Sequence, residues 1–123
     1  MKKILITGGS GFIGTNFINF IFKKKYKILN IDKISDISTP EKFKKIYDIK
    51  KYKLLKYDLN DSNKKLNIIN KFQPNYIINF AAESHVDRSI NDPIYFIKNN
   101  INSATNLFHA YLNYYKKKKI KLF

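Results

Sequence analysis

All four glycines of this chain fall in one short segment, at Gly8, Gly9, Gly11 and Gly14. Their spacing satisfies both G-x-G-x-x-G and G-x-x-G-x-x-G, patterns typical of a turn that binds phosphate groups. In such a turn the first glycine permits the tight bend, Gly11 lets a phosphate approach the backbone, and Gly14 lets the next helix pack closely. Unpaired N–H groups at the start of that helix would bind a pyrophosphate. A purely structural turn is the alternative, but the concentration of every glycine here favours a nucleotide site.

Asp32 ends the second apolar run of the chain, residues 27–31, and supplies a carboxylate. A carboxylate at this place can accept hydrogen bonds from both hydroxyls of an adenosine ribose and repels a 2′-phosphate, which favours NAD over NADP. A solvated side chain or an unrelated cap is the alternative, and the neighbouring Lys33 is a cation that could tolerate a phosphate. Asp58 ends the third apolar run and could accept from an adenine amine while the Leu59 N–H donates to the ring. An aspartate that merely starts a turn accounts for Asp58 almost equally well.

A third group of polar side chains follows the fourth apolar run. Ala81 and Ala82 leave room for a flat cofactor at the strand end. Several functional side chains then share one short loop: Glu83, Ser84, His85, Asp87 and Arg88. This loop would lie at the carboxyl edge of the sheet, where open α/β sheets bind their ligands. Ser, His and Asp residues so close in sequence rarely converge into a hydrolytic triad, and a loop hydrogen bond explains His85 as well as a substrate contact does.

The apolar runs and their spacing predict alternating strands and helices. Strands are expected at residues 3–7, 27–31, 52–57, 76–80 and 120–123, and helices at 12–25, 38–51, 61–72 and 93–115, with a polar loop at 81–92. The alternation predicts a doubly wound α/β fold, in which a parallel sheet with right-handed crossovers carries helices on both faces. Because the last apolar run begins just before the final residue, we interpret the chain as one domain truncated at the start of its fifth strand.

The composition narrows the class of protein. The net charge is +15, and all of the 24 basic residues except Arg88 are lysines. Base recognition relies on arginine forks, so scattered solvated lysines are favoured over a nucleic-acid site. The absence of cysteine excludes disulfides and thiolate catalysis and makes the cytoplasm the default location. No stretch approaches the roughly 20 apolar residues of a membrane span, and the first apolar run is too short for a signal peptide.

Together these motifs resemble the extended short-chain dehydrogenase/reductase family, and within it the NAD-dependent sugar-nucleotide 4,6-dehydratases. The resemblance covers nearly the whole chain, although the glycine turn is shared by the superfamily and residues 81–89 are far more specific. It implies a Rossmann-type domain over residues 1–123, NAD as cofactor, a sugar nucleotide (dTDP-glucose above all) as substrate, and a homodimeric intact enzyme. Related UDP-sugar enzymes carry a similar stretch, so another nucleobase, an epimerase and a non-catalytic NAD-binding module remain alternatives.

The resemblance also implies roles for the matching residues. The cofactor would contact Gly8, Gly11, Phe12, Ile13, Gly14, Asp32, Lys33, Ile34, Ser35, Asp58, Leu59, Phe80, Ala81, Ala82, Glu83, Ser84 and Asn99. The substrate sugar would contact Ser84, His85 and Asp87. Two positions depart from the family pattern, since Asn99 replaces a usual Thr and Ser103 replaces a usual Gly, which could alter helix packing.

The catalytic groups of the family, a Thr-Asp-Glu segment and a Tyr-x-x-x-Lys pair, follow the fifth strand and have no match here. Tyr-x-x-x-Lys is spelled several times, as at Tyr52 and Lys56, but 9 tyrosines among so many lysines make such matches expected by chance. No catalytic residue and no metal site is therefore assigned, and the chain alone is expected to be inactive. In the whole enzyme, hydride would pass from the sugar C4 to NAD, water would leave across C5 and C6, and the hydride would return at C6.

Overall fold

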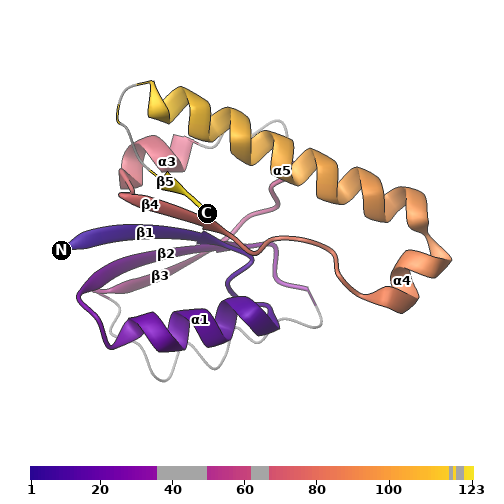
Figure 1. Cartoon of the computed structure of the whole chain (residues 1–123), viewed down its shortest axis with the longest axis horizontal. Helices are drawn as coiled ribbons and strands as arrows, with labels where there is room; N and C mark the ends of the chain where they lie inside the picture. The colour runs from indigo at the N-terminus through magenta and orange to yellow at the C-terminus, as the bar shows by residue number, and fades with distance from the viewer. Residues whose placement is uncertain (36–49, 62–66, 117, 119–120) are drawn as a thin grey trace.

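The computed structural model describes residues 1–35, 50–61, 67–116, 118 and 121–123. Strands and helices alternate along these residues, as Figure 1 shows. Their bounds are β1 (Lys2–Thr7), α1 (Phe12–Phe22), β2 (Tyr26–Asp32), β3 (Tyr52–Lys56), α3 (Asn67–Phe72), β4 (Tyr76–Asn79), α4 (Val86–Asn91), α5 (Pro93–Tyr115) and β5 (Lys121–Leu122).

The described strands form one parallel sheet in the order β3-β2-β1-β4-β5. β1 is central, and its Ile6 pairs with Asn30 of β2 on one side and Ile78 of β4 on the other. Because the strands are parallel, the carboxyl ends of β1, β2 and β4 meet at one edge. The strand order reverses between β1 and β4, and such a switch point opens a crevice at that edge.

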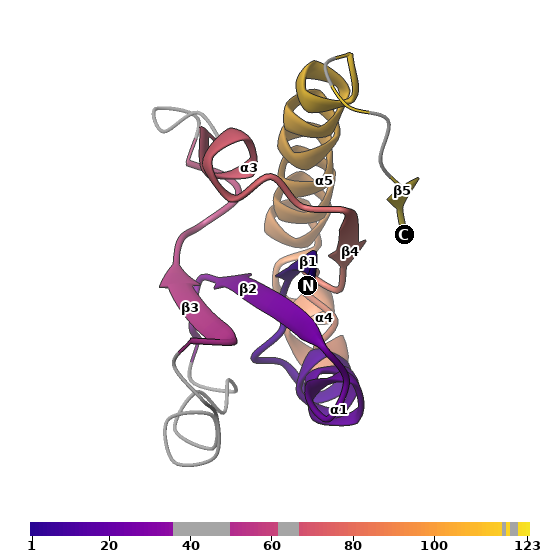
Figure 2. The ribbon, with the colours of Figure 1, turned by 90° about the vertical axis from the view of Figure 1, so that its left-hand side faces the viewer.

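Helices cover both faces of the sheet, with α1 on one face and α3 and α5 on the other (Figure 2). Ile4 and Ile6 of β1 pack with Ile18 of α1, whereas Leu5 packs with Leu107 of α5 on the opposite face. This alternation follows from the two-residue repeat of a strand. A strand buried on both faces needs apolar residues at every position, which explains the continuous apolar runs. The predicted doubly wound α/β fold is confirmed.

The segment predicted to be a polar loop, residues 81–92, contains the short helix α4. No residue of α4 is buried, so no apolar periodicity could reveal the helix in the sequence. The Asp92 carboxylate after it accepts a hydrogen bond from the Tyr95 N–H at 3.0 Å and caps α5, whose first residue is Pro93. α1 ends at Phe22, three residues before the predicted end of this helix at residue 25.

Residues 38–49 of one predicted helix and residues 62–66 of another lie outside the described residues. The predicted fifth strand is present as β5, which pairs with β4. Among the residues that the structure describes, no helix is long and apolar enough to cross a membrane.

Candidate functional site

A cavity of about 360 Å³ lies at the carboxyl edge of the sheet. Its walls are Gly8, Gly11, Phe12, Ile13, Gly14, Ile31, Asp32, Lys33, Ser35, Tyr57, Asp58, Leu59, Asn60, Phe80, Ala81, Ala82, Glu83, Ser84, His85 and Ser103. All the residues predicted to contact the cofactor line it, except Ile34 and Asn99. The size lies within the range of about 300–1,000 Å³ that is usual for small-molecule sites.

Two glycines of the turn are required by the fold itself. Gly8 has φ +68°, and a Cβ there would lie 2.5 Å from the backbone nitrogen of Ala81. A Cβ on Gly14 would collide with the Gly8 carbonyl oxygen and come within 2.5 Å of the Gly9 Cα. Gly8 therefore lets the turn pass close to β4, and Gly14 lets α1 pack against the turn.

Gly11 is different, because nothing in the described protein requires a glycine there. Its φ is −74°, which any residue adopts, and an added Cβ would meet only the Gly8 carbonyl oxygen at 3.5 Å. The open space beside Gly11 belongs to the cavity. Gly11 is also the N-cap of α1, and no side chain of the described residues caps this helix. The floor of the cavity thus presents a bare backbone and the N-terminus of a helix, which suits a phosphate group.

The Asp32 carboxylate is buried at the end of β2 and is held by the backbone on both sides. One oxygen, Oδ2, accepts from the Ser10 N–H at 2.9 Å, and Oδ1 accepts from the Ile34 N–H at 2.8 Å. Ile34 has φ +57°, a conformation that a β-branched residue rarely adopts, and the bond to Asp32 helps to hold it. Each carboxylate oxygen retains a second lone pair, so Asp32 can still accept from a ligand in the cavity.

Asn30 of β2 holds the glycine turn in place, and sequence reasoning overlooked it. The side chain is fully buried; its Oδ1 accepts from the Gly9 N–H at 3.0 Å, and its Nδ2 donates to the Ser10 hydroxyl at 3.1 Å and the Tyr52 hydroxyl at 3.0 Å. A Cβ on Gly9 would collide with this side chain. One signal in the sequence could have revealed this role. Asn30 is an amide inside an apolar run, and a buried amide has to be hydrogen-bonded to another group.

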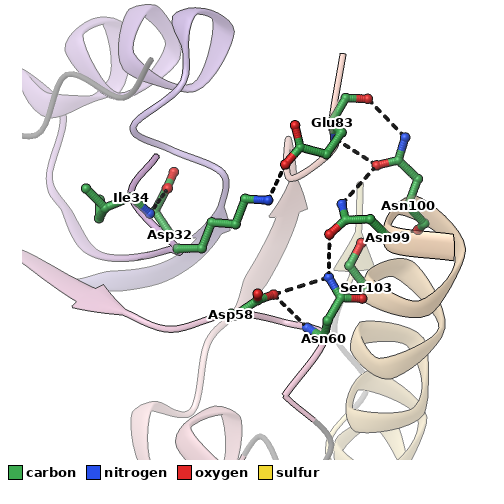
Figure 3. A network of polar contacts seen from close by, with 9 residues as sticks. Asp32, Ile34, Asp58, Asn60, Glu83, Asn99, Asn100 and Ser103 are labelled. Atoms are coloured by element: carbon green, nitrogen blue, oxygen red, sulfur yellow. Dashed lines mark hydrogen bonds and ion pairs between the residues drawn. The ribbon is translucent and has the colours of Figure 1, made fainter. Parts of the chain in front are cut away.

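Carboxamides connect the end of β3 to α5 (Figure 3). Asn60 donates from its N–H at 2.9 Å and its Nδ2 at 3.2 Å to Oδ1 of Asp58, which leaves Oδ2 of that carboxylate for other partners. The Asn60 Nδ2 also donates to Oδ1 of Asn99 at 2.7 Å, and Asn99 in turn donates to Asn100 at 3.4 Å. The Asn60 Oδ1 is buried, and no described residue is hydrogen-bonded to it. Asn99 therefore lies behind the cavity wall, where it supports Asn60.

The far wall of the cavity is formed by the segment after β4. The Glu83 backbone is held by Asn100, whose Oδ1 accepts from the Glu83 N–H at 2.7 Å and whose Nδ2 donates to the Glu83 carbonyl at 3.0 Å. The Glu83 carboxylate is only 9% exposed and forms an ion pair with Lys33, which crosses from the end of β2. Ser84 and His85 also line the cavity, whereas Asp87 is exposed in the first turn of α4 and is not part of the wall.

Four wall residues were absent from the predicted site: Ile31, Tyr57, Asn60 and Ser103. Burial raises the pKa of Tyr57, and the Asp61 and Asp58 carboxylates add to the shift, so Tyr57 is protonated and donates to the Asp61 carbonyl at 3.1 Å. Ser103, which was expected to alter helix packing, is buried and donates to the Asn100 carbonyl at 3.2 Å. Ile34 lines a second cavity of about 450 Å³ next to the first, and four residues belong to both walls: Lys33, Ser35, Tyr57 and Asp58.

The family described as GDP-mannose 4,6 dehydratase matches residues 5–123 of the chain. The dTDP-glucose 4,6-dehydratase of Haemophilus influenzae is 37% identical over 116 residues, which are 94% of this chain and 34% of that protein. The chain thus spans about a third of the length of this curated relative.

The solved structures similar to the chain include a dehydratase and an epimerase. A dTDP-glucose 4,6-dehydratase from Bacillus anthracis in complex with NAD has a TM-score of 0.75 and 30% identity, and the match covers 99% of this chain and 36% of that one. A UDP-Glc/GlcNAc 4-epimerase from Campylobacter jejuni has a TM-score of 0.82 and 26% identity, with 92% of this chain and 34% of that one covered.

Proposed function

Because the chain belongs to the GDP-mannose 4,6 dehydratase family of extended short-chain dehydrogenase/reductase enzymes, we propose that it is the NAD-binding part of a dTDP-glucose 4,6-dehydratase. The whole enzyme then converts dTDP-glucose to its 4-keto-6-deoxy product and water. One observation carries the proposal: the cavity is open at Gly11, where α1 begins, and the Asp32 carboxylate lies beside the same turn. This combination suits a pyrophosphate joined to a free ribose diol.

The two halves of the cavity suit the two halves of the dinucleotide. The backbone N–H groups of Phe12 and Ile13 beside Gly11 would hold the pyrophosphate, and the remaining lone pairs of Asp32 would accept from the ribose hydroxyls. Oδ2 of Asp58 accepts from the adenine amine, since the bonds from Asn60 both go to Oδ1.

The other end of the cavity suits the nicotinamide and the sugar. Ala81 and Ala82 line it with small side chains, and Ser84 and His85 follow toward the position of the sugar. Bound NAD would supply the hydride acceptor and donor of the reaction. The described residues supply binding and orientation, and we assign none of them to catalysis.

A sugar-nucleotide 4-epimerase is the second candidate, because the epimerase structure shares the fold closely. The sequence favours the dehydratase, since the identity is 30% to the dehydratase structure and 26% to the epimerase structure. Residues 81–89 also carry the dehydratase-like stretch.

A calorimetric titration of the chain with NAD and with NADP tests the proposal. We expect NAD to bind with a dissociation constant in the micromolar range, about −8 kcal/mol, and NADP to bind at least about tenfold more weakly. We also expect the chain to turn over no dTDP-glucose. Well-folded protein that gives no heat with millimolar NAD contradicts the proposal, and turnover by the chain contradicts the assignment of the described residues to binding alone.

We further propose that the whole enzyme is a homodimer that pairs through α5. The apolar residues on the outer face of this helix are each more than half exposed: Ile94, Ile97, Ile101, Phe108 and Leu112. Their spacing places them on one stripe, opposite the face that buries Leu107 and Tyr114 against the sheet. An exposed apolar stripe of this length indicates an association surface, and two identical stripes can cover each other across a twofold axis.

Ile101→Glu is expected to prevent this pairing, because it places a charge in the centre of the stripe. Light scattering coupled to gel filtration of the whole enzyme should give the mass of two subunits for the wild type and the mass of one subunit for this variant. Asn102→Glu is the matched control, since Asn102 is the next residue on α5 and is also exposed. An unchanged mass for Ile101→Glu, or a loss of dimer in both variants, argues against pairing through the stripe.

A further inference from the structure

Lys33 is the wall residue whose charge conflicts with a preference for NAD. It follows Asp32 directly at the end of β2, next to the expected position of the ribose 2′-hydroxyl. A cation near this hydroxyl is the usual means of accepting the 2′-phosphate of NADP. Lys33 also lines both cavities, so its ammonium has open space within reach on two sides.

The structure shows where this cation is held. The Lys33 ammonium pairs with the Glu83 carboxylate, and the pair joins the ends of β2 and β4. The dashed line that ends at the Glu83 carboxylate in Figure 3 marks this pair. Burial alone lowers the pKa of Lys33, but the hydrogen bond and charge of Glu83 outweigh it and raise the pKa, so the ammonium is charged. The charge of Asp58 acts in the same direction.

Glu83 is held in place by contacts other than the ion pair with Lys33. Asn100 of α5 binds both the N–H and the carbonyl of Glu83, and the carboxylate is nine-tenths buried. Lys33 is more exposed, with about a third of its side chain accessible. Glu83 is thus the rigid partner, and Lys33 is the partner that would have to move.

We propose that Glu83 is a positioning residue for cofactor choice, which withholds the Lys33 ammonium from a 2′-phosphate and so reinforces the selection of NAD by Asp32. This inference rests on the proposed NAD-binding function. For NADP to use Lys33, the ammonium must leave a buried carboxylate without its counter-ion, which is strongly unfavourable. Selection then has two components: Asp32 repels the phosphate, and Glu83 holds the ammonium of the neighbouring residue Lys33 in an ion pair.

The test compares the ratio of NADP to NAD dissociation constants, measured by calorimetry, in wild type and Glu83→Gln. Gln has the same length, and the bonds from Asn100 reach only the backbone of residue 83, so the fold is expected to persist. Release of Lys33 should lower the ratio by about tenfold, the size of one charge-assisted contact. The double variant Lys33→Met with Glu83→Gln should return the ratio to the wild-type value.

The outcomes separate this inference from the function on which it rests. No NAD binding by the wild type overturns both. NAD binding with a ratio that stays within about twofold in Glu83→Gln, or a lowered ratio that persists in the double variant, overturns this inference alone. A lower melting temperature with an unchanged ratio identifies the pair as a structural link, which also overturns it. Should Glu83→Gln not fold, Glu83→Asp provides the same comparison, because its shorter side chain retracts the carboxylate from Lys33.

Discussion

Gly14→Ala is expected to destabilise the chain by about 3 kcal/mol or more, whereas Gly11→Ala should change its stability by less than about 1 kcal/mol. At Gly14 the new methyl group would meet backbone atoms of Gly8 and Gly9, which cannot move without displacing the turn. At Gly11 it would meet only one carbonyl oxygen, at an ordinary contact distance of 3.5 Å. The free energies of unfolding follow from urea denaturation monitored by circular dichroism.

The affinity for NAD should reveal the role of Gly11, although its substitution is expected to leave the stability nearly unchanged. Gly11→Ala remains folded but carries a methyl group where the pyrophosphate is proposed to lie, so its dissociation constant should rise at least about tenfold, a loss of about 1.4 kcal/mol. Calorimetry on the folded variant measures this loss directly. If Gly11→Ala binds NAD as tightly as the wild type does, the pyrophosphate does not lie over this residue.

Asp32→Ala is expected to weaken NAD binding by about 100-fold and also to lower the free energy of unfolding by about 2–4 kcal/mol. The loss of affinity follows from the two ribose hydroxyls that lose their acceptor. The loss of stability follows because the Ser10 and Ile34 N–H groups lose theirs, and Ile34 is held in a left-handed conformation. Calorimetry and urea denaturation measure the two losses separately.

Asp32→Asn is the matched control for this prediction. It keeps the size of the side chain and one oxygen acceptor, so it should lose less stability than the alanine variant. Its Nδ2 cannot accept, and so NAD binding should still fall clearly. A variant that loses stability but retains full NAD affinity would assign Asp32 to the turn alone.

The sheet and its order of elements could be predicted from the residues in sequence. Runs such as residues 3–7 and 76–80 are apolar throughout, because strands in a parallel sheet are buried on both faces. The glycine turn was equally predictable, since Gly8 and Gly14 meet steric demands that no other residue satisfies. α4 could not be predicted, because a helix with no buried residue carries no apolar pattern.

The side-chain partners across the cavity could not be predicted in the same way. Asn30 lies inside an apolar run, and only the folded sheet brings it against Gly9 and Tyr52. Asn99 and Asn60 meet because α5 packs beside the end of β3, and this contact links Asn99, which does not line the cavity, to a residue that does.

The order of the residues was therefore sufficient for the features that depend on neighbours along the chain: the strand runs, the tight turn, the helix that begins after Gly11, and the carboxylate that ends β2. Such features arise from backbone sterics and short-range periodicity, which act within a few residues. Folding alone decided which distant side chains meet, above all that the cation at Lys33 is neutralised by Glu83 across the cavity. Hydrogen bonds and ion pairs form over a few ångströms in space, and only the docking of β2, β4 and α5 brings these groups within that range.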